Sequence, residues 1–159
     1  MNPEPTLAAP GKYLTFALAG EEYGVPVLKV REIITIMDIT AVPQMPNHVK
    51  GVINLRGRVI PIVDMRLKFD LPVSPDTERT CIIVVEVDVD ARRIMLGVIV
   101  DSVSDVLSIV SEDIEATPEF GSRLDTAYIC GVAKIKGSVK LLLDLDRLLA
   151  AHFGAATAA

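Results

Sequence analysis

The chain has 159 residues, of which 50% are hydrophobic and only 4% aromatic, and its formal net charge is -5. This length suits one ordinary domain or two very small ones with a shared core, and the high apolar content with modest charge excludes disorder. The longest uncharged aliphatic run, Ile94 to Val100, is much shorter than the roughly 20 residues of a membrane-spanning helix. The acidic balance, the scarcity of aromatic residues and the lack of a Lys/Arg cluster along the sequence argue against nucleic-acid binding.

Most of the elements expected along the chain are strands. Residues 1–11 contain three prolines and are interpreted as a flexible leader, 12–153 as the domain and 154–159 as a flexible tail. Valine and isoleucine fit a pleated sheet well because they are stiff at the Cβ branch. Apolar runs between turn residues predict strands at 13–18, 22–25, 58–63, 80–89, 94–100, 106–110, 129–135 and 138–143. Pro61 lacks a backbone donor and therefore predicts an edge or irregular strand.

Helical signals are fewer. Pro26 suits the first position of a helix, and four apolar residues follow it at helical spacing, Val27, Val30, Ile33 and Ile34. Asp64 and Asp144 each precede a short helical pattern, where an aspartate accepts hydrogen bonds from free backbone N–H groups. The stretch from Leu145 to His152 is the best helix in the chain.

Two pairs of segments repeat in the same order. Residues 51–64 match 131–144 at an offset of 80, with Gly, Val, Gly, Val and Asp at the same places, and 24–32 match 97–105 at an offset of 73. Each of the longer segments is typical of strand, glycine turn, strand and aspartate-capped helix. The repeat predicts two similar small β units side by side, with a groove between them lined by equivalent positions such as Val30 and Val103.

Residues suited to catalysis are few. His48 follows a proline in an expected loop and His152 ends the last helix, so both are interpreted as structural or simply exposed. Cys81 and Cys130 begin apolar strands, as buried thiols do in a reducing compartment. There is no phosphate-binding glycine loop, no metal-ligand spacing and no cofactor motif, so an enzyme is disfavoured.

One charged position suggests a contact surface. Arg56 precedes Gly57 at an expected hairpin tip in an apolar neighbourhood, where an arginine either is simply solvated or anchors a partner. Glu32 is a candidate ion-pair partner, within the chain or across an interface.

Several long motifs resemble the CheW family of chemotaxis coupling proteins. The similarity runs from about Lys12 to His152 and is carried by residues 21–33, 42–69, 97–107, 118–120 and 143–149. The resemblance implies a mainly β fold of two intertwined five-stranded SH3-like barrels with short helices and a C-terminal helix. It also implies a non-catalytic, cofactor-free cytoplasmic adaptor at the receptor array, without direct membrane insertion. The implied partners are the regulatory domain of the histidine kinase CheA and the cytoplasmic tips of chemoreceptors.

The resemblance also implies a receptor-binding groove. Carried over to this sequence, the groove falls on Val30, Arg56, Leu96, Gly97, Val103 and Val106, and Glu32 matches an acidic position tied to coupling. The kinase-facing surface is placed only loosely, on apolar elements of one barrel. A CheW-like protein of a non-flagellar pathway, controlling pili or development, is the alternative. A small-molecule-binding barrel or small hydrolase is the rival from another class, although the sequence offers no convergent polar constellation for it.

Overall fold

The computed structural model describes residues 8–72, 75–116 and 128–149, which form two β-sheets. The first sheet has the strand order β8 (Ser102–Ile109), β1 (Gly11–Leu18), β2 (Glu21–Pro26), β11 (Ser138–Leu143), β10 (Ile129–Ile135) and β9 (Ile114–Glu115). The second has the order β3 (Val30–Thr35), β6 (Cys81–Val89), β7 (Arg92–Val100), β5 (Arg58–Asp64) and β4 (Val49–Leu55). The helical turns are η1 (Val27–Lys29), α1 (Met65–Lys68), η2 (Ser111–Asp113) and residues 145–149. The mainly β prediction is confirmed.

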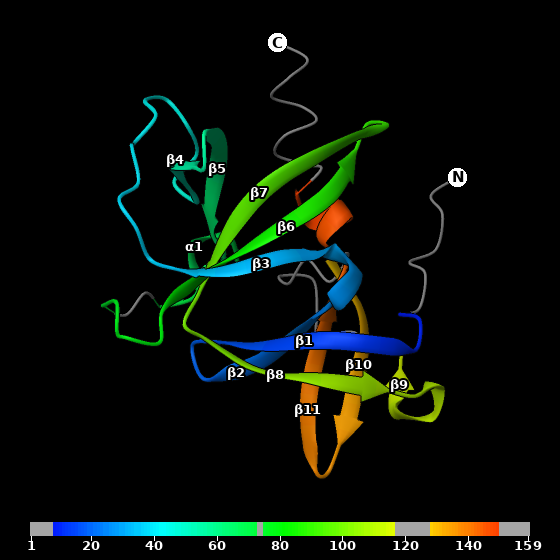
Figure 1. The fold of residues 1–159 in the computed structure, drawn as a ribbon. Helices are drawn as coiled ribbons and strands as arrows, with labels where there is room; N and C mark the ends of the chain where they lie inside the picture. Colours follow the sequence, from blue (N-terminus) through cyan, green and yellow to red (C-terminus); the bar gives the residue numbers. More distant parts are fainter. Residues whose placement is uncertain (1–7, 73–74, 117–127, 150–159) are drawn as a thin grey trace.

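The two sheets exchange strands. The β1–β2 hairpin belongs to the first sheet, but the chain then crosses through η1 and places β3 beside β6 in the second. The β6–β7 hairpin belongs to the second sheet, and the chain after it returns to place β8 beside β1 in the first. In Figure 1 the second sheet lies above the first, and the two views together show β3 and β8 on either side of β1. The predicted intertwining is therefore present.

The sequence repeat corresponds to a repeat in the fold. The β4–β5 hairpin and the β10–β11 hairpin turn through the same backbone conformation, with φ of 50° and 86° at Arg56 and Gly57 and of 50° and 80° at Lys136 and Gly137. At the base of the hairpins, the N–H of Asp64 donates to the His48 carbonyl (2.7 Å) and that of Asp144 to the Tyr128 carbonyl (2.9 Å). The two donors are 80 residues apart in the sequence, and so are the two acceptors, which is the offset of the repeat.

Both aspartates cap the turns that follow them. The Asp64 carboxylate accepts a hydrogen bond from the Arg66 N–H at 3.0 Å, and the Asp144 carboxylate accepts one from the Arg147 N–H at 3.1 Å. Each bond satisfies a backbone donor that the first helical turn leaves unpaired. The predicted caps are confirmed. The final helix is described through residue 149, and the rest of the expected helix, to His152, lies outside the described residues.

Two equivalent glycines bring the repeats together. Gly97 of β7 pairs in parallel with Ile62 of β5, and Gly24 of β2 pairs with Leu142 of β11. A Cβ at Gly97 would lie 2.7 Å from the Ile62 Cδ1 atom, and one at Gly24 would lie 3.0 Å from the Leu142 Cδ2 atom. The missing side chain therefore makes room for the large aliphatic residue opposite at both places.

An ion pair holds each chain crossing between the sheets. After β7, Asp101 accepts a hydrogen bond from Arg66 Nη1 at 3.1 Å and one from the Ala19 N–H at 2.7 Å. After β2, Lys29 Nζ binds Asp146 Oδ2 at 2.9 Å and Asp88 Oδ2 at 3.4 Å. Arg66 and Asp146 are equivalent positions, 80 residues apart, so the repeat makes the same kind of contact with the charges reversed.

Arg66, which holds the crossing after β7, is almost fully buried. The side chains of Arg66 and Asp64 are only 4% and 2% exposed, and they meet at 3.0 Å between Nε and Oδ1. The hydrogen bonds to Asp64 raise the pKa of Arg66 above its ordinary value. Buried charges of this kind are tolerated only when they are paired and hydrogen-bonded.

Valine and isoleucine fill a core shared by both sheets. The main cluster contains Phe16 and Leu18 of β1 together with the continuous run Ile82–Val85 of β6. Residues of both sheets thus bury each other, which explains why neither unit needs a large core of its own.

Two sequence-based expectations are wrong or incomplete. No helix extends from Pro26 beyond the three residues of η1, because β3 alternates inward and outward and pairs with β6 from Val30 to Thr35. β5 is an inner strand, but its pairing with β7 begins only at Ile62. Val52, opposite Pro61, exchanges both of its backbone hydrogen bonds with Thr40. The missing donor of Pro61 therefore faces an unpaired stretch.

The ends of the chain are described only in part. Of the expected leader, residues 1–7 lie outside the described residues, and so does the expected tail at 154–159. Ala8 is buried, and its N–H donates to the Cys130 carbonyl at 2.8 Å.

Candidate functional site

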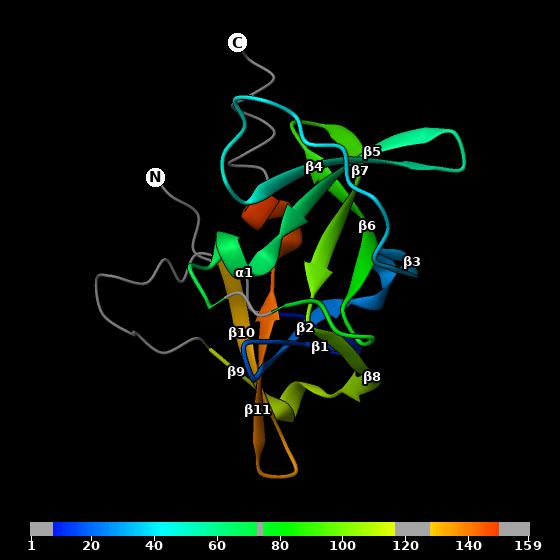
Figure 2. The ribbon, with the colours of Figure 1, turned by 90° about the vertical axis from the view of Figure 1, so that its left-hand side faces the viewer.

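An ion pair joins the two ends of the second sheet. Arg56, at the tip of the β4–β5 hairpin, donates to the carboxylate of Glu32 on β3. These strands stand at opposite ends of the strand order, so the sheet curls until its ends approach. The arginine side chain is 70% exposed, because its backbone belongs to a turn that projects beyond the core (Figure 2). The ion pair predicted for Glu32 is formed within the chain.

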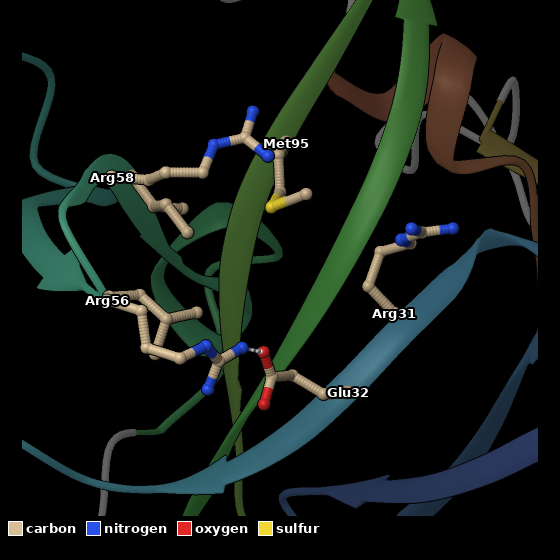
Figure 3. Close-up of a pocket in the computed structure, with 7 residues that line it drawn as sticks. Arg31, Glu32, Arg56, Arg58 and Met95 are labelled. Atoms are coloured by element: carbon tan, nitrogen blue, oxygen red, sulfur yellow. Dashed lines mark hydrogen bonds and ion pairs between the residues drawn. The ribbon is translucent and has the colours of Figure 1, made fainter.

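A cavity of about 380 Å³ opens beside this pair. Figure 3 shows Arg56 and Glu32 meeting among the lining residues, with Arg58 directed toward Met95. The remaining lining comes from Arg31, Leu55 and Ile60. Its lining thus combines four charged side chains with three apolar ones, a composition that could contact another molecule.

The other residues of the predicted groove are divided between surface and core. Val106 on β8 is 51% exposed, and Val30 and Val103 are partly buried against the core. Leu96 is fully buried, and Gly97 is buried between Ile62 and Ile82. Leu96 and Gly97 therefore present no side chain to a partner. Of the set, only Glu32 and Arg56 line the cavity described above.

Two surface features were missed in the sequence. Ile33 is 46% exposed on β3, and its repeat equivalent on β8 is Val106, at the offset of 73. The repeat relates Ile33 to Val106 and could have indicated that both are exposed on strands. The interpretation of residues 27–34 as a helix prevented that inference. Arg58 and Arg92 are exposed near the cavity, 34 positions apart in sequence, and only the fold brings them together.

Metal ligation and the reactivity of the titratable groups can be assessed for the described residues. They contain no group of three or more His, Cys, Asp and Glu side chains suited to a metal ion. Burial raises the pKa of the Cys130 thiol to about 11, so little of the nucleophilic thiolate exists near neutrality. Burial, followed by the charge of Lys68, lowers the pKa of His48. Within the same residues there is no helix long and apolar enough to cross a membrane.

A family model for the CheW-like domain matches residues 12–153. The chain belongs to this family. It is 39% identical to the chemotaxis protein CheW of Klebsiella aerogenes over 89% of this chain and 82% of that protein. It is 37% identical to the CheW of Bacillus subtilis, over 87% of this chain and 86% of that one.

A solved structure of a CheW protein agrees with the fold. The crystal structure of the scaffolding protein TtCheW from Thermoanaerobacter tengcongensis superposes with a TM-score of 0.77 at 33% identity, covering 88% of this chain and 92% of that chain. The strand exchange described above is therefore the arrangement expected of a CheW-like domain. The Arg56–Glu32 pair lies within the part of the chain that the family model matches.

Proposed function

We propose that this chain is a non-catalytic cytoplasmic adaptor that couples chemoreceptors to the histidine kinase CheA in chemotaxis signalling. The observation that carries the proposal is the 39% identity to a chemotaxis protein CheW over 89% of the chain. The geometry supports it, since the Arg56–Glu32 pair and the exposed apolar side chains of Ile33 and Val106 offer area for contact.

The proposed receptor-facing surface combines the Arg56–Glu32 pair with exposed apolar residues of β3 and β8. Ile33 and Val106 are 46% and 51% exposed on strands that edge the two sheets. A receptor hairpin would lay apolar side chains on these strands, as an amphipathic helix does in a groove. Arg56 would fix its register by hydrogen bonds, because an arginine side chain donates in a rigid planar fork.

The proposed kinase-facing surface is the segment between β3 and β4. It carries three apolar side chains that are 37–40% exposed, Met37, Val42 and Met45. An adaptor needs a second surface separate from the first, and these residues provide apolar area for one.

A pull-down with a receptor cytoplasmic fragment tests the receptor surface, and receptor-dependent CheA autophosphorylation tests coupling. We expect Val106→Lys to reduce receptor binding by about tenfold or more, because it places a charge in an apolar contact. Val139→Lys is the matched control, since Val139 is equally exposed at 51% on β11. Equal losses in both variants would contradict the assignment of β8.

The hairpin tips provide a second matched pair. We expect Arg56→Ala to weaken receptor binding and kinase activation, whereas Lys136→Ala at the equivalent tip leaves both unchanged. If Arg56→Ala and Val106→Lys both bind receptor and activate kinase normally, the proposed groove is wrong. Normal receptor binding with failed kinase activation would instead place the pair on the kinase side.

A further inference from the structure

Five of the nine arginines in this acidic chain gather around two adjoining cavities of the second sheet. The first is the cavity beside Arg56 and Glu32, and the second has a volume of about 420 Å³. Arg58, Ile60 and Met95 line both, so the two are continuous. We call this surface the arginine groove, and its arginines are Arg31, Arg56, Arg58, Arg92 and Arg93.

The groove exists because two strands diverge. β5 and β7 pair in parallel only at Ile62–Asp64 and Gly97–Ile99. The earlier parts of both strands, from Arg58 and from Arg92, separate and leave a depression between them that is the second cavity. On their other sides these parts of β5 and β7 are hydrogen-bonded to β4 and β6. The depression is therefore a feature of the sheet itself.

Two of the five arginines have no acidic partner among the described residues. Arg31 pairs with Glu86 at 3.6 Å, Arg93 with Asp88 at 3.5 Å, and Arg56 with Glu32. No ion pair is formed by Arg58 or Arg92 within residues 8–72, 75–116 and 128–149. The groove therefore presents two guanidinium groups that its own carboxylates do not neutralise.

Apolar side chains accompany these two arginines. Val59 is 70% exposed beside Arg58, and Met95 and Ile94 are half-buried in the same lining. Cations beside accessible apolar area suit a ligand that carries carboxylates and aliphatic side chains together.

We infer that the arginine groove binds an acidic segment of a partner protein, with two carboxylates contacting Arg58 and Arg92 and an apolar side chain between them on Val59 and Met95. This inference is separate from the proposed receptor surface on β3 and β8 and shares with it only the Arg56–Glu32 pair. Two guanidinium groups without an acidic partner among the described residues match two carboxylates. Nucleic acid or an anionic membrane fits less well, because Glu32, Glu86 and Asp88 would repel a run of phosphates. The groove also contains no aromatic ring on which bases could stack.

Fluorescence anisotropy on the full-length protein tests the inference. The probe is a labelled synthetic peptide with two glutamates four residues apart and leucines between them, and its matched control has glutamine at both positions. We expect the glutamate peptide to bind at low salt and to weaken as salt is added, because exposed charge pairs are screened. Arg58→Ala and Arg92→Ala should each weaken it about fivefold or more.

Arg79→Ala is the control variant. Arg79 is exposed near the start of β6, whereas Arg92 lies at the other end of the β6–β7 hairpin, opposite Val89. The affinity of Arg79→Ala for the glutamate peptide should stay within about twofold of that of the unmodified chain. Thermal melting of each variant establishes that the fold is retained.

Three outcomes would overturn the inference. The glutamate and glutamine peptides bind equally or not at all, or Arg79→Ala costs as much as Arg58→Ala. The third outcome is tighter binding of another anionic probe than of the glutamate peptide, together with a loss of that binding in Arg58→Ala. The probes are a single-stranded oligonucleotide and vesicles of phosphatidylglycerol and phosphatidylcholine. None of these results affects the pull-down test of the receptor surface, so the two proposals fail separately.

Discussion

The two halves of this chain build the same arrangement with different residues. Residues 11–68 and 81–149 each provide a hairpin, a strand given to the other sheet, a second hairpin and a short helix. At the crossings, one half uses Arg66 against Asp101, and the other uses Asp146 against Lys29. A contact between the short helix and the crossing thus recurs in both halves, and either member carries the positive charge.

The halves also differ at their hairpin tips. Arg56 reaches Glu32 across the second sheet, but no ion pair joins the equivalent Lys136 and Asp105 among the described residues. The Asp105 carboxylate instead accepts a hydrogen bond from the N–H of its neighbour Val106 at 2.8 Å. A repeat that has lost symmetry at one exposed position is a reason to look there for function.

The largest expected difference is between the two crossings. We expect Arg66→Met to cost about 3–5 kcal/mol, because it leaves the buried Asp64 carboxylate without its charged partner. Lys29→Met should cost about 1 kcal/mol or less, since Lys29 and Asp146 are 29% and 34% exposed and water replaces the lost contact. Urea unfolding of both variants measures the two costs. Similar values would show that burial does not distinguish the crossings.

A smaller difference is expected at the start of the equivalent hairpins. At Gly51, φ is 143° and a Cβ would lie 2.0 Å from the Thr40 carbonyl oxygen, so Gly51→Ala must displace backbone. At Gly131 the nearest atom is Ile114 Cγ2 at 3.1 Å, a side-chain end that can move. We expect losses of about 3 kcal/mol and about 1 kcal/mol respectively, measured as shifts in the unfolding midpoint. A larger loss at Gly131 would contradict this ranking.

The smallest difference concerns the two glycines between the strands. Gly97→Ala should cost about 2 kcal/mol, since a Cβ would meet Ile62 and Ile82 at 2.7 Å, and Gly24→Ala about 1 kcal/mol, with one contact at 3.0 Å. Calorimetry on both variants gives the comparison. If Gly97 acts on partners only through packing, receptor binding per folded molecule should remain unchanged in Gly97→Ala. A loss of binding without a loss of stability would give Gly97 a direct role.

Local sequence patterns predicted the strands correctly where the apolar spacing fitted only one type of secondary structure. The strands Ile129–Ile135 and Ser138–Leu143 have the predicted bounds, because their apolar runs end at a glycine turn and at a capping aspartate. The helix prediction for residues 27–34 was wrong, because the same apolar residues fit either one face of a helix or one face of a strand. The tertiary pairing of β3 with β6 decided between these two possibilities.

The sequence by itself determined the β class, the repeat, the capping aspartates and the place of Arg56 at a hairpin tip, since all of these depend on residues close together in the chain. Only the tertiary structure decided that Arg56 meets Glu32, that Leu96 is buried and that five arginines share one groove. These contacts arise from the curl of a sheet and from an exchange of strands between two sheets. Both depend on which distant segments pair, which a local pattern does not encode.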